Sequence, residues 1–118
     1  MRHHNKNRKF GRNRAQRGAL LKGLAVNLIR AGRIKTTEAK AKELRPYMEK
    51  LVTRANIGTL ASKRIIISRL MNRAKESKML IEEIAPKFKG VAGGYTRVLK
   101  LPPRKSDGAK LALIEFVK

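Results

Sequence analysis

The sequence predicts an α+β fold of about four helices packed on a small mixed sheet of about three strands, with an extended basic N-terminal arm. Apolar residues recur at helical spacing up to about residue 84. The remainder carries turn residues and two short runs of β-forming residues. Residues 1–12 are basic and nearly devoid of apolar side chains, so they have nothing to bury. We therefore expect an arm at residues 1–12 and one globular domain at residues 13–118.

The first predicted helix follows the arm directly. Asn13 is a good N-cap, and Gln16 stands three residues later, which is the spacing of a capping box. Gly32 is suited to the left-handed position that ends a helix. One face of the helix carries the apolar stripe Leu21, Ala25, Leu28 and Ile29. We expect this stripe to pack in the core.

A short strand at residues 33–36 and a second helix come next. Thr37 is the expected N-cap, and Glu38 in the first turn favours the helix dipole. Pro46 lies inside the helical pattern and predicts a kink or a break, because proline lacks the backbone N–H. Gly58 marks the end of the helix.

Two shorter helices complete the helical part. Ser62 is the expected cap of a helix that reaches about residue 73. A fourth helix is predicted at about residues 76–84, and Pro86 should stop it.

The C-terminal third predicts a hairpin. Residues 90–94 form a glycine-rich turn, and strands are expected at residues 95–101 and 111–117. The loop between these strands is too short for a helical crossover, so they should pair antiparallel.

Charge is the dominant compositional feature. Lys and Arg number 30 against eight Asp and Glu, giving a net charge of +22 and a pI near 11.5. Such a chain needs a polyanion, and nucleic acid is the most common one. The absence of cysteine excludes disulfides, thiolate zinc sites and iron–sulfur clusters. No apolar run approaches the ~20 residues of a membrane span, and a secretory signal peptide is not evident.

The residues that enzymes use do not form a recognisable site. His3 and His4, the only histidines, are neighbours on the arm and are interpreted as extra donors to phosphates or bases. Carboxylates such as Glu38, which stands four residues before Lys42, and Glu49 are interpreted as parts of solvated helix faces. We therefore expect no catalytic residue, no metal site, no cofactor and no small-molecule substrate.

The strongest local feature is an acid-free start. Residues 1–37 contain eleven Lys or Arg and no Asp or Glu, so these charges repel one another without an external anion. Aromatic residues are only 4% of the chain, with Phe10 and Tyr95 as candidates for base stacking. The composition thus favours phosphate and shape recognition of structured RNA. A sequence-nonspecific, architectural DNA-binding protein is the alternative, and an anionic membrane surface is a weaker one because the basic residues are spread along the whole chain.

Several motifs in order resemble the bacterial large-subunit ribosomal protein seventeen family. At the N-terminus they are Met1-Arg2-His3, Arg8-Lys9-x-Gly11-Arg12-Asn13 and Arg17. The internal motifs are Ile34-Lys35-Thr36-Thr37 and Lys40-Ala41-Lys42-Glu43-Leu44-Arg45. The C-terminal motifs are Gly93-Gly94-Tyr95-Thr96-Arg97, Asp107-Gly108-Ala109 and Ile114-Glu115. The chain departs from the family pattern after Asn13, where small hydroxyl residues and a histidine are common.

The resemblance implies a structural, non-catalytic component of the large subunit, bound to 23S ribosomal RNA near the polypeptide exit-tunnel side. Neighbouring large-subunit ribosomal proteins would be its other partners. The expected location is the ribosome of the cytoplasm rather than that of an organelle. We expect no membrane insertion and no homo-oligomer. Together with the charge pattern, it gives three sets of candidate RNA-binding residues. The arm contributes Arg2, His3, His4, Lys6, Arg8, Lys9, Arg12 and Asn13. The next segment contributes Arg14, Arg17, Lys22, Arg33, Lys35, Thr36, Thr37 and Lys40. The C-terminal third contributes Gly93, Gly94, Tyr95, Arg97, Arg104 and Lys105.

Overall fold

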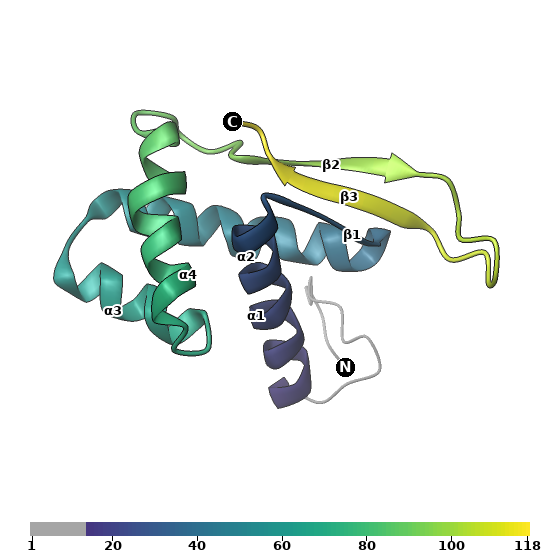
Figure 1. The fold of residues 1–118 in the computed structure, drawn as a ribbon, viewed down its shortest axis with the longest axis horizontal. Helices are drawn as coiled ribbons and strands as arrows, with labels where there is room; N and C mark the ends of the chain where they lie inside the picture. Colours follow the sequence, from purple (N-terminus) through teal and green to yellow (C-terminus); the bar gives the residue numbers. More distant parts are fainter. Residues whose placement is uncertain (1–13) are drawn as a thin grey trace, which may run out of the picture.

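A computed structural model describes residues 14–118, in which helices pack against one face of a three-stranded sheet (Figure 1). The helices are α1 (Arg14–Ala31), α2 (Glu38–Ile57), α3 (Leu60–Arg69) and α4 (Ala74–Met79), and α4 continues into the π-helical turn η1 (Leu80–Ile84) and the 3-10 turn η2 (Ala85–Phe88). The strands are β1 (Arg33–Thr37), β2 (Thr96–Leu101) and β3 (Leu111–Phe116). The α+β class is confirmed. The expected arm and the Asn13 cap lie outside the described residues.

The sheet has the strand order β1-β3-β2, and both pairs are antiparallel. The predicted hairpin of β2 and β3 is confirmed. The expectation of a mixed sheet is wrong, because β1 pairs with the last strand in the opposite direction, with Arg33 opposite Glu115 and Thr37 opposite Leu111. The backbone N–H of Glu38 donates to the carbonyl of Lys110 at 2.9 Å, which extends this pairing into the start of α2.

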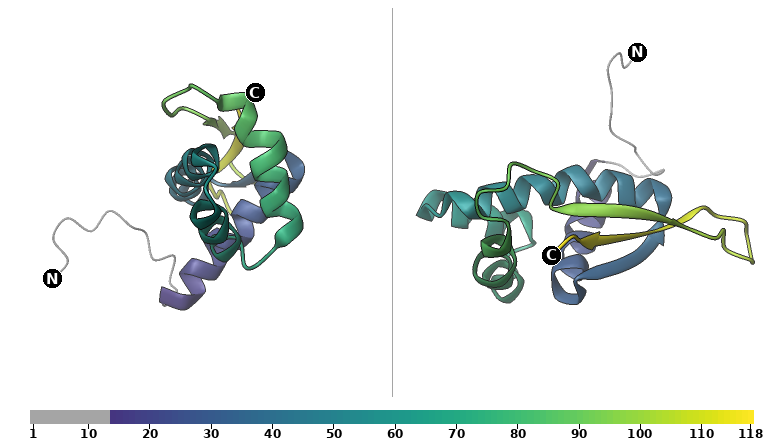
Figure 2. Two further views of the ribbon diagram at one scale, coloured as in Figure 1. Left: turned by 90° about the vertical axis from the view of Figure 1, so that its left-hand side faces the viewer. Right: turned by 90° about the horizontal axis from the view of Figure 1, so that it is seen from above.

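Alternation along the strands divides the sheet into two faces. Ile34, Ile114 and Val98 are aligned across the three strands and pack in or against the core. The helices, chiefly α2, cover this face, while the other face is open (Figure 2). The largest fully buried side chains include Phe88, Leu28, Leu44, Met48 and Ile66.

Helix α1 is embedded only along its C-terminal half. Its fully buried residues are Ala25, Val26, Leu28 and Ile29, whereas the predicted Leu21 is half-buried. The N-terminal half projects past the other helices (Figure 1). Gly32 ends the helix as predicted, with φ +83° and its N–H bonded to the Leu28 carbonyl at 2.7 Å.

Helix α2 begins and ends as predicted but is not broken at Pro46. The Thr37 hydroxyl accepts from the Lys40 N–H, and Gly58 adopts a left-handed φ of +77°. Pro46 is exposed, so the Lys42 carbonyl that it leaves without an intrahelical donor lies on the solvent side of the helix, where water can hydrate it. Buried residues on both sides of Pro46 hold the two halves against the core and keep the helix continuous.

The boundaries of α3 differ from those expected. Thr59, not Ser62, is the N-cap: its hydroxyl accepts from the Ser62 N–H at 3.1 Å. The helix also ends earlier, at Arg69, because the chain reverses through Met71 and Asn72, both with φ +57°. A left-handed methionine is uncommon, and the sequence contains no glycine that would predict this turn.

The fourth helical segment starts before the predicted position and passes Pro86. Pro86 stands in the first turn of η2, where its missing N–H is not needed. The wider π-helical turn η1 precedes η2, so the chain stays helical as far as Phe88, first as a π-helical turn and then as a 3-10 turn. The expectation that Pro86 stops the segment is therefore wrong.

Candidate nucleic-acid interface

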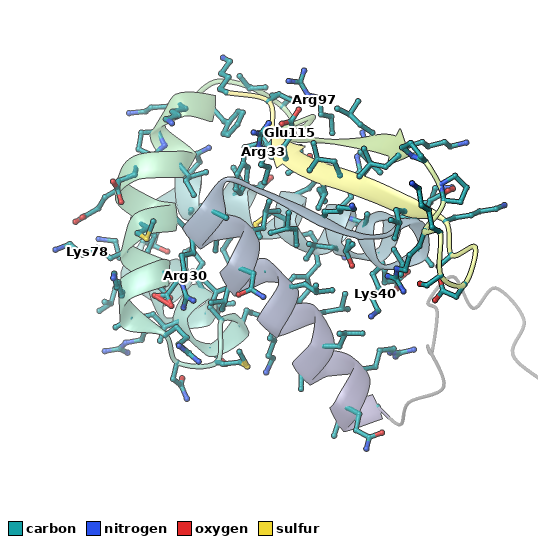
Figure 3. The ribbon with its side chains drawn as sticks, turned by 45° about the vertical axis from the view of Figure 1, so that its right-hand side comes forward. Arg30, Arg33, Lys40, Lys78, Arg97 and Glu115 are labelled. Carbon is teal, nitrogen blue, oxygen red and sulfur yellow. The ribbon has the colours of Figure 1, made fainter. Side chains whose placement is uncertain are left out.

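The open face of the sheet brings together cations that are distant in sequence. Arg33 on β1 and Arg97 on β2 both stand opposite Glu115 on the central strand β3. Arg97 Nε donates to Glu115 Oε1 at 2.7 Å, and Figure 3 shows all three side chains gathered above the sheet. One acidic residue thus stands between two arginines in this row, which leaves an excess of positive charge on this face.

The next row of the same face is partly aliphatic. Lys35, Leu113 and Leu99 are aligned across the three strands, and Leu99 is 45% exposed. The row has no aromatic ring on which a base could stack. Its chemistry suits contact with phosphates and ribose rather than base reading.

The hairpin loop and the start of α2 form a second basic region at one end of the molecule. The loop carries Arg104 and Lys105, and Lys110 at its base is joined by its carbonyl to the N–H of Glu38. Thr36 and Lys40 therefore lie at the same end of the molecule as the hairpin loop, and Figure 3 shows Lys40 there. Lys110 was not among the sequence-based candidates, because a lone lysine between a turn and an apolar segment carries no pattern.

An acidic residue shapes the loop. Arg104 Nη1 bonds to Asp107 Oδ2 at 3.0 Å, and the N–H of Ala109 donates to Asp107 Oδ1 at 3.1 Å. The Ala109 hydrogen bond, with the Arg104 charge adding to it, lowers the pKa of Asp107 below its ordinary value of 3.8. The loop is thus held in one shape while its remaining cations are exposed.

The candidates on α1 lie on its projecting half. Arg14 and Lys22 line a shallow groove whose floor is formed by small residues, including Ala15 and Gly18. A Cβ added to Gly18 would meet nothing within 4 Å, so no described neighbour requires this glycine. The absence of a side chain here leaves room at the surface of α1.

The glycine-rich segment before β2 is used inside the protein. Tyr95 is only 3% exposed, packs edge-on against Phe88 with ring centroids 5.1 Å apart, and donates its hydroxyl to the Val91 carbonyl at 3.0 Å. The prediction that Tyr95 stacks on a base is wrong. A buried ring following a turn cannot be distinguished from an exposed one by sequence alone.

Glu49 on α2 explains the fold of this segment. Its Oε1 accepts from the N–H groups of Gly94 at 2.9 Å and Tyr95 at 3.2 Å. Its Oε2 accepts from the N–H and the hydroxyl of Thr96, both at 2.8 Å. Glu49 is therefore not part of a solvated helix face, and the N–H groups of Gly94 and Tyr95 are occupied by a carboxylate of the chain itself.

Sequence reasoning also missed a group of cations on the C-terminal half of α2 and the end of α3. Lys50, Arg54 and Arg69 line a groove of about 410 Å³ together with Thr53 and Ile57. Arg69 is far from Lys50 and Arg54 in the sequence, so only the packing of α2 against α3 brings the three cations together.

Residues 14–118 contain no group of three or more His, Cys, Asp or Glu that could hold a metal ion. Within the same residues, no helix is both long and apolar enough to cross a bilayer.

Comparisons with known proteins match almost the whole chain. Residues 20–117 match the family model described as ribosomal protein L17. The chain is 48% identical to the large ribosomal subunit protein bL17 of Campylobacter jejuni subsp. doylei over 117 residues, covering 99% of each chain. It is 50% identical to the protein of the same name from Gemmatimonas aurantiaca over 117 residues, covering 99% of this chain and 98% of the relative. Identity to the Methylacidiphilum infernorum protein of that name is 47% over 118 residues, which is 100% of this chain and 89% of the relative.

Proposed function

The chain belongs to the ribosomal protein L17 family, and we propose on this basis that it is a structural constituent of the large ribosomal subunit that binds 23S ribosomal RNA. The family is structural and non-enzymatic, so the chain is not an enzyme. Its place of action is the cytoplasmic ribosome, where it supports subunit assembly and translation. Neighbouring large-subunit proteins are its other partners.

The observation that carries the proposal is the cross-strand alignment of Arg33 and Arg97 on either side of Glu115. Arg97 forms an ion pair with Glu115, Arg33 stands opposite the same residue in the strand register, and Lys35 follows in the adjacent row. Guanidinium groups suit the bidentate binding of phosphates. A polyanion that binds this face would neutralise its excess positive charge.

The binding surface extends beyond the sheet. The basic arm at residues 1–12 threads between RNA helices, α1 adds Arg14, Arg17 and Lys22, and the hairpin-loop end adds Lys40, Arg104 and Lys105. The mechanism is charge neutralisation, in which Lys and Arg replace condensed counterions and allow RNA phosphates to approach one another. Recognition relies on the phosphates and the shape of the RNA, because the Tyr95 ring is buried and cannot stack on a base.

The arm is tested by deleting residues 1–12 and measuring incorporation into large subunits and affinity for a 23S ribosomal RNA fragment. The arm contains five Lys or Arg, and each phosphate contact adds about 0.7–0.9 to the log–log salt slope. We expect the slope to fall by up to about 4, with reduced incorporation. A full-length variant with these five cations changed to glutamine is the control for arm length and should behave like the deletion.

Two results would contradict the proposal. Normal incorporation with an unchanged salt slope would show that the arm does not bind RNA. Tighter binding to duplex DNA than to the ribosomal RNA fragment at the same moderate salt would favour a DNA-binding architectural protein instead.

A further inference from the structure

A cationic groove lies at the α2–α3 corner, opposite the hairpin loop. Lys50 and Arg54 stand one turn apart on α2, and Arg69 faces them from the end of α3. Figure 1 shows the corner at the far end of α2 from the loop between β2 and β3. A helix of 20 residues is about 30 Å long, so the two ends are well separated.

The groove has a fixed frame. The Tyr47 hydroxyl on α2 donates to the Arg69 carbonyl at 2.6 Å and ties the end of α3 to α2. On the other side, the Thr53 hydroxyl is 3.1 Å from that of the buried Tyr95. The backbone positions of the three cations are therefore held by hydrogen bonds that do not consume their charges.

These cations are left without acidic partners. Within residues 14–118 the ion pairs use other cations, and none involves Lys50, Arg54 or Arg69. Glu49, adjacent to Lys50, has both carboxylate oxygens engaged by residues 94–96. Like charges one helical turn apart destabilise a helix, so this spacing is unfavourable for the isolated protein.

We propose that this groove is a second binding site for the sugar–phosphate backbone of RNA, separate from the arm, α1 and sheet-face contacts. Charge complementarity selects the occupant, because three unneutralised cations converge on one groove. Ile57, which is 59% exposed beside them, offers an aliphatic contact for ribose. The protein then holds one RNA segment at each end of α2 and acts as a clamp between them. This inference rests on the proposed function, since it assumes that ribosomal RNA is the ligand.

The test compares two triple variants with the same loss of charge. Lys50→Gln, Arg54→Gln and Arg69→Gln together remove the groove cations. Lys75→Gln, Lys78→Gln and Lys87→Gln remove three exposed cations from α4 and η2. With a 23S ribosomal RNA fragment, the groove variant should lower the log–log salt slope by roughly 2, and the control by less than about 1.

A second measurement locates the RNA. The chain has no cysteine, so Ile57→Cys provides a unique attachment point for an iron chelate that generates hydroxyl radicals, and Ala15→Cys provides one on α1. In reconstituted large subunits, the probe at position 57 should cleave a ribosomal RNA segment different from that cleaved by the probe at position 15.

The outcomes separate the two proposals. Equal slopes for the two triple variants, or no RNA cleavage from position 57, would overturn the groove site alone. Cleavage of a neighbouring protein from position 57 without RNA cleavage would also overturn it. A wild-type protein that fails to bind ribosomal RNA would overturn the proposed function, and the groove site with it.

Discussion

Removal of the Glu49 carboxylate should weaken the whole fold, because it joins α2 to the start of β2. Its two oxygens accept four hydrogen bonds, three of them from backbone N–H groups. Of these three donors, Gly94 is exposed and can be hydrated, whereas Tyr95 and Thr96 are 3% and 2% exposed. The change Glu49→Ala would leave the last two without acceptors.

The magnitude follows from these two donors. A buried N–H group left without a partner costs about 1–3 kcal/mol. Two such groups give a loss of roughly 2–5 kcal/mol in the free energy of unfolding, even if water reaches one of them in part. For a chain of this size, each kcal/mol corresponds to a fall of about 4 °C or more in Tm. Glu49→Gln keeps one acceptor oxygen and should lose less than Glu49→Ala.

Urea denaturation at constant ionic strength provides the assay, since guanidinium would screen the many cations of this chain. Glu83→Ala is the matched control, because it removes the same charge from an exposed position. We expect it to change stability by no more than about 0.5 kcal/mol. A Glu49→Ala protein as stable as the Glu83→Ala protein would refute the view that this carboxylate holds the segment.

The pKa of Asp107 is lowered, so its contribution to stability is present above its ordinary pKa of 3.8 and is lost as the pH falls through the lowered value. Asp107→Asn should abolish this loss of stability in acid, measured by unfolding across that pH range. Burial raises the pKa of Tyr47 above 10.0, so its contribution is present below pH 10.0 and is lost as the pH rises through the raised value. Tyr47→Phe should remove that alkaline step and lower stability by about 1 kcal/mol through loss of the bond to Arg69, and an unchanged urea midpoint would contradict this. Pro46→Ala should stabilise α2 by roughly 1 kcal/mol or more, and lower stability would mean that the helix requires the proline. Thr37→Ala should cost about 1 kcal/mol, measured by the same urea unfolding, while a loss below about 0.3 kcal/mol would argue against its capping role.

Local chemistry explains which sequence-based expectations are confirmed. The ends of α1 and α2 at Gly32 and Gly58 depend on the left-handed conformation of single glycines, and the Thr37 cap depends on a hydroxyl at the first turn. Such features are determined within a few residues. The hairpin of β2 and β3 was predictable for the same reason, since a short loop permits only antiparallel pairing.

Features that depend on distant residues were missed or mistaken. Pro46 was expected to kink or break α2; the helix is not broken there, because burial of the residues on either side holds it against the core. Tyr95 was predicted to be a stacking candidate, but its ring packs against Phe88 and its backbone N–H is bound by Glu49, and both partners come from other segments. The left-handed turn at Met71 has no local cause in the sequence.

The sequence by itself determined the fold class, the excess of positive charge and hence the need for a polyanion, and the family resemblance. The tertiary structure decided which cations lie together: Arg33 and Arg97 on either side of Glu115, and Lys50 and Arg54 with Arg69 across a helix corner. It also decided that Glu49 stabilises the fold rather than lying in solvent. The physical reason is that charge and capping are local properties, whereas cross-strand register and helix packing join residues that the sequence separates.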